Sequence, residues 1–272
     1  MPLSLFSPPT VDRRTWCSAG LAMSVASVVC HSARGRDWAG HFQVGCWHIR
    51  ASFPLSVDGA PYAAALRELE RAAGATLRLP APRAPVSVIL LADAAEYERY
   101  VQTYFPGVPR RPALFLQAGG PGIILTYRSA DWETDLRHEA THGLLHASLP
   151  FVPLWLDEGL AEYFEVKAPQ RIREHPHWKP LQRRLRRGRV PSLTRLEGMT
   201  QLEQMDAADY RAAWSWVAWL LHESPQSRQT LRRYLADWAG GRPPLPLSRQ
   251  LGPAAALEQR YRAFWKQSAN QS

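Results

Sequence analysis

The order of strand-like and helical segments is the feature that most restricts how this 272-residue chain can fold. Four segments in its first half carry the alternating or short continuous apolar patterns of β-strands: His41–Phe53, Val86–Ala92, Ala113–Ala118 and Gly122–Tyr127. Two segments between them, Tyr62–Ala73 and Ala94–Tyr104, have the apolar spacing of helices. The last two strands are joined through Gly119-Gly120-Pro121, so we expect them to form a hairpin.

The chain is almost entirely helical in its pattern from Asp131 onward. The predicted helices are Trp132–Ala147, Trp155–Lys167, Pro180–Arg187, Ala207–His222, Ser227–Trp238 and Ala254–Trp265. Strands followed by helices predict an α+β fold, with a small mixed or antiparallel sheet packed on helices and followed by a helical C-terminal part. The Pro-rich stretch Gly240–Gly252 precedes the last helix, so we expect one domain over residues 38–239 and a connection with a C-terminal helix over residues 240–272.

The composition excludes several classes of protein. Hydrophobic residues make up 46% of the chain and charged residues 21%, which is typical of a globular protein and excludes wholesale disorder. Three cysteines cannot form a disulfide framework or a zinc finger, so a metal would be held mostly by histidine and carboxylate. The net charge of +9 permits binding to polyanions without requiring it.

A basic run over Arg171–Arg189 contains eight arginine and lysine residues. One interpretation is a solvated helix face. The other is an anion-binding patch that steers acidic substrates or tethers the protein to an acidic envelope polymer. No recognised nucleic-acid-binding module accompanies these charges, so no specific nucleic-acid partner is expected.

The N-terminal residues have the pattern of an export signal. Arg13 and Arg14 precede a stretch of thirteen uncharged residues, Cys17–Val29, which is long enough for the apolar part of a signal and too short to span a membrane. The arginine pair resembles a twin-arginine signal. We therefore expect residues 1–33 to direct export to the periplasm, cell envelope or extracellular space; a disordered N-terminus is the alternative. No transmembrane span is expected in the rest of the chain.

The motif His138-Glu139-Ala140-Thr141-His142 carries the sharpest functional signal. Residues four apart on a helix differ by about 40° in direction and about 6 Å in height, so the two imidazoles can converge on one ion. Glu139 lies beside them, where it can take a proton from a metal-bound water. A catalytic zinc site requires a third protein ligand and one open position, and the acidic segment Trp155–Tyr163 offers candidates.

These two segments together, HEATH followed by WLDEGLAEY, resemble the gluzincin metallopeptidases and most closely the peptidase-MA-like domain family. The resemblance implies a zincin-like fold in which Glu158 is the third zinc ligand and Glu139 the general base. It also places Glu162 where related enzymes have an acidic partner for a ligating histidine. Related enzymes supply a tyrosine or histidine to the oxyanion from a later helix, and Tyr210 is the candidate here. Simple packing is the other interpretation of Tyr210.

The expected function is zinc-dependent hydrolysis of peptide bonds, with one Zn²⁺ per chain and a peptide or protein substrate. The alternative is a non-catalytic, zinc-containing binding or cell-envelope structural protein of the same fold. His146 continues the histidine spacing, but it lies about 12 Å along the helix from His138, so we expect a packing or surface residue. Asp157 is expected to be an acidic residue that complements the dipole at the start of a helix.

Overall fold

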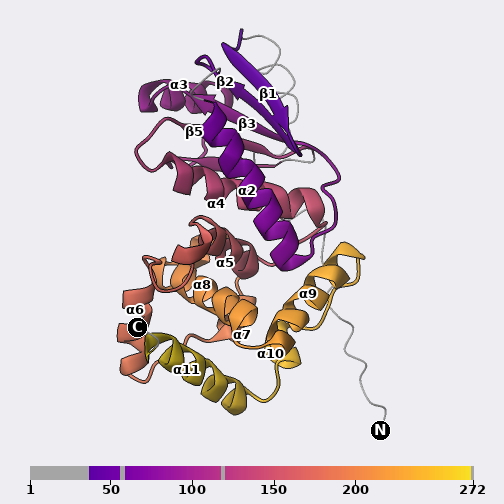
Figure 1. Ribbon diagram of the computed structural model, residues 1–272, viewed down its shortest axis with the longest axis vertical. Helices are drawn as coiled ribbons and strands as arrows, with labels where there is room; N and C mark the ends of the chain where they lie inside the picture. Colours follow the sequence, from indigo (N-terminus) through magenta and orange to yellow (C-terminus); the bar gives the residue numbers. More distant parts are fainter. Residues whose placement is uncertain (1–36, 56–58, 118–119, 271–272) are drawn as a thin grey trace.

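The computed structural model describes residues 37–55, 59–117 and 120–270. Figure 1 shows a sheet with its helices in one half of the molecule and a group of helices in the other half. The expected α+β fold is therefore confirmed. The export signal expected over residues 1–33 lies outside the described residues. Within the described part of the chain, no helix is long and apolar enough to cross a bilayer.

The sheet is mixed and has five strands in the order β1-β2-β3-β5-β4. The strands are β1 (Gly40–Val44), β2 (Trp47–Ala51), β3 (Val86–Leu91), β4 (Leu114–Leu116) and β5 (Ile123–Tyr127). The three middle strands are parallel, whereas β1 and β4 are antiparallel edge strands. The hairpin predicted before Asp131 is confirmed as β4 and β5, with Leu114 opposite Leu125.

The single strand predicted over His41–Phe53 is wrong, because this segment forms two strands. Val44 pairs with Trp47, so only Gly45 and Cys46 make the turn between β1 and β2. Gly45 has a φ of 54°, a value that the first central residue of such a tight hairpin requires and that glycine adopts without strain. The alternating apolar pattern continues through both strands, which is why it resembled one longer strand.

Both faces of the sheet are covered. The helices on this half are α2 (Ala60–Leu77), α3 (Ala94–Tyr104) and α4 (Trp132–Ser148). Val88 and Leu90 of β3 belong to the core that includes residues of α2 and α4. The alternate residues Ile89 and Leu91 pack with α3 in a second apolar cluster. Since successive side chains of a strand point to opposite faces, α3 covers one face of the sheet while α2 and α4 cover the other.

Helices make up the rest of the chain, and α5 packs closely against α8. Their bounds are α5 (Leu154–Phe164), η1 (Ala168–Gln170), α6 (Trp178–Arg186), α7 (Leu193–Glu197), η2 (Leu202–Gln204), α8 (Ala207–His222), α9 (Pro225–Ala239), α10 (Leu247–Gln250) and α11 (Ala254–Asn270). A Cβ at Gly159 would lie 2.8 Å from the backbone carbon and oxygen of Ala213, so only glycine allows this approach of the two helices.

The C-terminal helix is part of the main core. Tyr261 and Trp265 of α11 are buried, and the hydroxyl of Tyr261 donates a hydrogen bond to Oγ of Ser215 on α8 at 2.6 Å. The aromatic rings of Trp265 and Trp214 lie 5.5 Å apart. Helix α11 therefore packs in the same core as α8.

Candidate metal centre

The helix α4 carries the HEATH motif along the side of the sheet. Its apolar stripe, Leu136, Ala140 and Leu144, is buried, as the sequence predicts. A Cβ at Gly143 would lie 3.0 Å from Cγ1 of Val86, so the glycine lets α4 pack tightly on β3. This packing fixes which side of α4 faces away from the sheet, toward α5 of the other half (Figure 1).

Three predicted ligands come together between α4 and α5. One ligand atom from each of His138, His142 and Glu158 lies within 4.8 Å of the other two. Oε2 of Glu158 lies 3.7 Å from Nε2 of His138 and 3.8 Å from Nε2 of His142. Ligand atoms around a tetrahedral zinc with bonds of about 2.0–2.1 Å are roughly 3.4 Å apart. Two imidazoles and one carboxylate at this spacing fit a zinc ion with one position left open.

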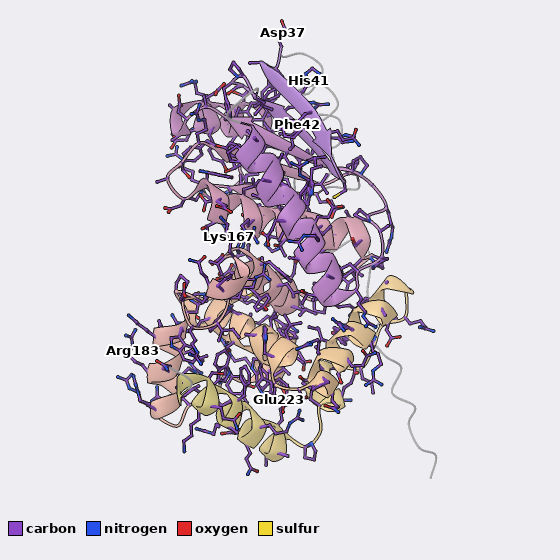
Figure 2. All side chains as sticks on the ribbon, in the orientation of Figure 1. Asp37, His41, Phe42, Lys167, Arg183 and Glu223 are labelled. Atoms are coloured by element: carbon purple, nitrogen blue, oxygen red, sulfur yellow. The ribbon has the colours of Figure 1, made fainter. Side chains whose placement is uncertain are left out.

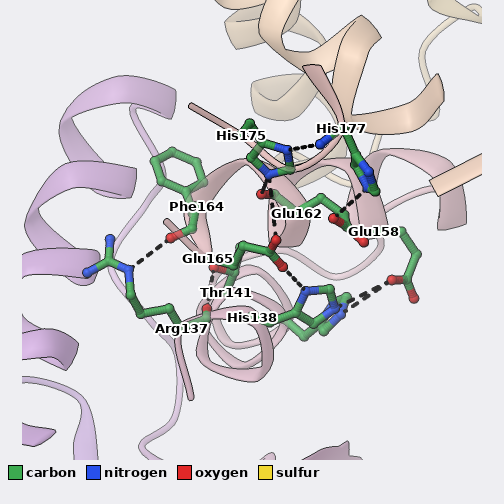
Figure 3. Close-up of polar contacts among 10 residues, drawn as sticks. Arg137, His138, Thr141, Glu158, Glu162, Phe164, Glu165, His175 and His177 are labelled. Carbon is green, nitrogen blue, oxygen red and sulfur yellow. Dashed lines mark hydrogen bonds and ion pairs between the residues drawn. The ribbon is translucent and has the colours of Figure 1, made fainter. Parts of the chain in front are cut away.

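A half-buried carboxylate lies beside the other ring nitrogen of each histidine. Nδ1 of His142 lies 2.9 Å from Oδ1 of Asp157, and Nδ1 of His138 lies 3.0 Å from Oε2 of Glu165 (Figure 3). Such a contact fixes the orientation and tautomer of a ligating imidazole and makes the nitrogen that faces the metal more basic. Both histidines therefore present Nε2 toward Glu158.

The charges at this site raise the pKa of His142 and lower the pKa of Asp157. Burial alone would lower the pKa of His142, but the charges of Asp157 and Glu158 outweigh it and raise this pKa to about 9. Burial alone would raise the pKa of Asp157, but the charges of His142 and His146 hold it below its usual range. A metal ion that binds at neutral pH must therefore displace protons from this site.

Glu162 was expected to be the acidic partner of a ligating histidine. In the structure its Oε2 pairs with Nε2 of His177 at 3.0 Å, and Glu165 is the residue that contacts Nδ1 of His138 (Figure 3). Glu165 follows Glu158 by seven residues, which is about two helical turns and returns the side chain to the same face of α5. That spacing is the sequence signal that could have identified Glu165.

A second group, His138, Glu162 and Glu165, also brings one ligand atom from each residue within 4.8 Å of the others. His138 is common to both groups, and its Nδ1 is already engaged by Glu165. Only the first group contains two imidazoles, the donors that zinc prefers together with a carboxylate. His138, His142 and Glu158 are therefore the better candidate zinc ligands of the two groups, with Glu165 beside one of them.

Asp157 also contacts a second histidine, His146, beside the edge strand β4. Nε2 of His146 lies 2.8 Å from Oδ2 of Asp157, so the two carboxylate oxygens contact two different histidines. The ring of Phe115, on the edge strand β4, stacks on His142 with centroids 6.1 Å apart and lies 5.4 Å from His146. Asp157 therefore lies in the first turn of α5, as predicted, and also contacts the ring nitrogens of two histidines.

Glu139 and Tyr210 both lie near the three ligands. Glu139 is half-buried on α4, and no hydrogen bond or ion pair to it occurs among the described residues. Tyr210 lies in the first turn of α8, where burial and then the charge of Glu158 raise its pKa. The positive charge of the nearby Arg111 acts on this pKa in the opposite direction. The hydroxyl of Tyr163 on α5 lies 2.6 Å from Nε2 of His222 on α8.

The basic run contains one buried cation, Arg171, one half-buried cation, Arg184, and six exposed ones. Arg171 is buried, with its guanidinium 4.7 Å from the ring centroid of Phe164. The exposed cations are Arg173, Lys179, Arg183, Arg186, Arg187 and Arg189. Arg183 projects from the outer side of α6 (Figure 2). The exposed cations of this run are compatible with either a solvated face or an anion-binding patch.

No protein-family model matches this chain, and no curated protein is similar to it at a significant level. The geometry of the site is therefore the basis for assigning a function.

Proposed function

We propose that this protein is a zinc-dependent metallopeptidase of zincin-like fold, with one Zn²⁺ held by His138, His142 and Glu158. The observation that carries the proposal is the convergence of these three ligand atoms within 4.8 Å, while a carboxylate holds Nδ1 of each imidazole. A surface cluster with accidental spacing would have no reason to bury Glu158 to 6% exposure and His142 to 7%.

The residues around the ligands have the properties that hydrolysis requires. Zinc, when bound, supplies a Lewis acid that polarises a carbonyl and lowers the pKa of water. The carboxylate of Glu139 takes the proton from the attacking water and delivers it to the leaving amine. The hydroxyl of Tyr210 donates a hydrogen bond to the carbonyl oxygen as negative charge develops there.

A peptide is the substrate class that best fits the surroundings of the site. The edge strand β4 pairs only with β5 among the described strands, so its outer side can pair with an extended backbone. Phe115 of this strand stacks on the ligand His142. A peptide lying along β4 therefore passes close to the metal ligands.

The test compares Glu139→Gln with Glu133→Gln, a variant on the same helix whose carboxylate pairs with Lys167 instead. We expect the purified wild-type protein to cleave members of a proteomic peptide library and a chelator to abolish cleavage. Glu139→Gln should keep zinc and lose activity by about 10²–10⁴-fold, the usual contribution of a general base. Glu133→Gln should retain activity. A zinc-loaded wild-type protein that cleaves no peptide would instead favour a non-catalytic binding or envelope protein.

A further inference from the structure

Helix α6 has an outer face on which every exposed residue is a cation. The exposed residues of α6 and of its C-terminal cap are Lys179, Arg183, Arg186 and Arg187. At about 100° per residue, their side chains project within an arc of about 100°. The buried residues Trp178 and Leu181 project to roughly the opposite side of the helix. Arg189 is exposed directly after the helix, and with it these cations form what we call the α6 cationic surface.

No acidic side chain neutralises this surface. Within residues 37–55, 59–117 and 120–270, no carboxylate forms an ion pair with any of its cations. Glu174 is the one acid between residues 171 and 189, and it lies before the helix begins. Exposed arginines elsewhere in the helical half do have acidic partners: Arg195 pairs with Asp209, and Arg242 pairs with Asp237 at 3.2 Å.

The helix dipole explains only part of this charge. Arg183 and Arg186 lie in the last turn of α6, where the dipole favours cations. Lys179 lies in the first turn, where the same dipole disfavours a cation. Lys179 and Arg183, like Arg183 and Arg187, are four residues apart, so each pair of like charges destabilises the helix. An external counter-charge would remove this repulsion.

The α6 cationic surface is carried on a fixed support. The ring of Trp178 lies 5.6 Å from the ring of Trp265 on α11. Nη2 of Arg262, also on α11, donates a hydrogen bond to the carbonyl oxygen of Gly188 at 2.7 Å. Helix α6 lies at the outer edge of the helical half, and Arg183 projects outward from it (Figures 1 and 2). A flat partner can therefore approach this edge without any rearrangement of the fold.

We propose that the α6 cationic surface docks the protein on a lipid bilayer that carries anionic phosphate headgroups. Guanidinium groups match phosphate oxygens in charge and in bidentate geometry, and most of these cations are arginines. A helix at an outer edge offers its cations to a flat surface together. Single-stranded nucleic acid is bound through aromatic side chains that stack on its bases, whereas Trp178 of this helix is buried. The docking is peripheral, because the apolar side of α6 is packed inside the protein.

The test measures cosedimentation with vesicles of two parts phosphatidylcholine and one part phosphatidylglycerol. We expect the wild type to bind them at about 0.1 M salt and to be released at about 0.5 M, because salt screens exposed charges. Arg183→Gln/Arg186→Gln should weaken binding about 25-fold, since each cation near an anionic bilayer contributes roughly fivefold to the affinity. Far-ultraviolet circular dichroism should be unchanged in this variant, whose two side chains are exposed.

The matched control is Arg242→Gln/Arg249→Gln, which removes the same charge from exposed positions after α9 and in α10. These helices lie on the other side of the helical half from α6 (Figure 1), so binding should weaken by less than about threefold. Equal weakening by the two double variants would mean that net charge alone drives binding, and it would overturn the assignment.

Two further outcomes would also overturn it. Equal binding to vesicles of phosphatidylcholine alone would exclude recognition of anionic headgroups. Binding to inorganic polyphosphate without binding to the anionic vesicles would identify a soluble polymer as the partner instead of a bilayer. None of these measurements involves peptide cleavage, so the docking proposal and the peptidase proposal stand or fail separately.

Discussion

Replacement of Asp157 by asparagine tests whether the carboxylate beside Nδ1 of His142 increases the affinity of the site for zinc. Its two oxygens lie 2.9 Å from Nδ1 of His142 and 2.8 Å from Nε2 of His146. Asparagine has one acceptor oxygen and no charge, so it can accept a hydrogen bond from only one of the two histidines and holds His142 without a charge. Loss of such a support costs about 10–100-fold in metal affinity, or about 1.4–2.7 kcal/mol. Glu165→Gln should have a similar effect through His138, and the double variant should lose roughly the product.

The assay is competition for zinc between the protein and a chromogenic chelator at fixed pH. Glu162→Gln is the matched control, because Glu162 belongs to the same helix and pairs with His177 rather than with a ligand. We expect this control to change zinc affinity by less than about threefold, since its loss leaves both supporting carboxylates in place. The reasoning is refuted if Glu162→Gln weakens binding as much as Asp157→Asn, or if Asp157→Asn has no effect.

Three further predictions concern the oxyanion, the helix contact and pH. Tyr210→Phe should lower kcat by about 10²–10³-fold without loss of zinc, and an unchanged kcat would make Tyr210 a packing residue. Gly159→Ala should lower the free energy of unfolding by about 1–3 kcal/mol in urea titrations, because its Cβ would lie 2.8 Å from the Ala213 backbone; unchanged stability would mean that α5 and α8 adjust freely. Zinc affinity should rise from pH 7 to pH 9, because the metal-free His142 has a pKa of about 9 and must lose its proton to bind; a flat profile would contradict this pKa.

Local patterns in the sequence predicted the elements that carry the site. The predicted helices Ala94–Tyr104 and Ala207–His222 have the same bounds as α3 and α8, and the HEATH helix extends one residue further than expected. Apolar spacing and capping residues such as Asp93 and Asp206 act within a few residues, so the sequence alone reveals them. The choice of His138 and His142 followed from helical geometry in the same way.

Contacts between elements could not be predicted in this way. The partner of His138 depends on how α4 and α5 cross, and that crossing depends on the packing of α5 against α8 at Gly159. Glu162 and Glu165 follow Glu158 by four and seven residues, so helical spacing returns both side chains to the same face, and the structure places Glu162 against His177 and Glu165 against His138. The split of the first strand likewise depended on one glycine with a positive φ.

Diffraction from crystals of the zinc-loaded protein, recorded on both sides of the zinc absorption edge, tests the central claim most directly. We predict one anomalous peak per chain at full occupancy, about 2.0–2.2 Å from Nε2 of His138, Nε2 of His142 and a carboxylate oxygen of Glu158. A peak among His138, Glu162 and Glu165 instead, or no peak between α4 and α5, would contradict the assignment.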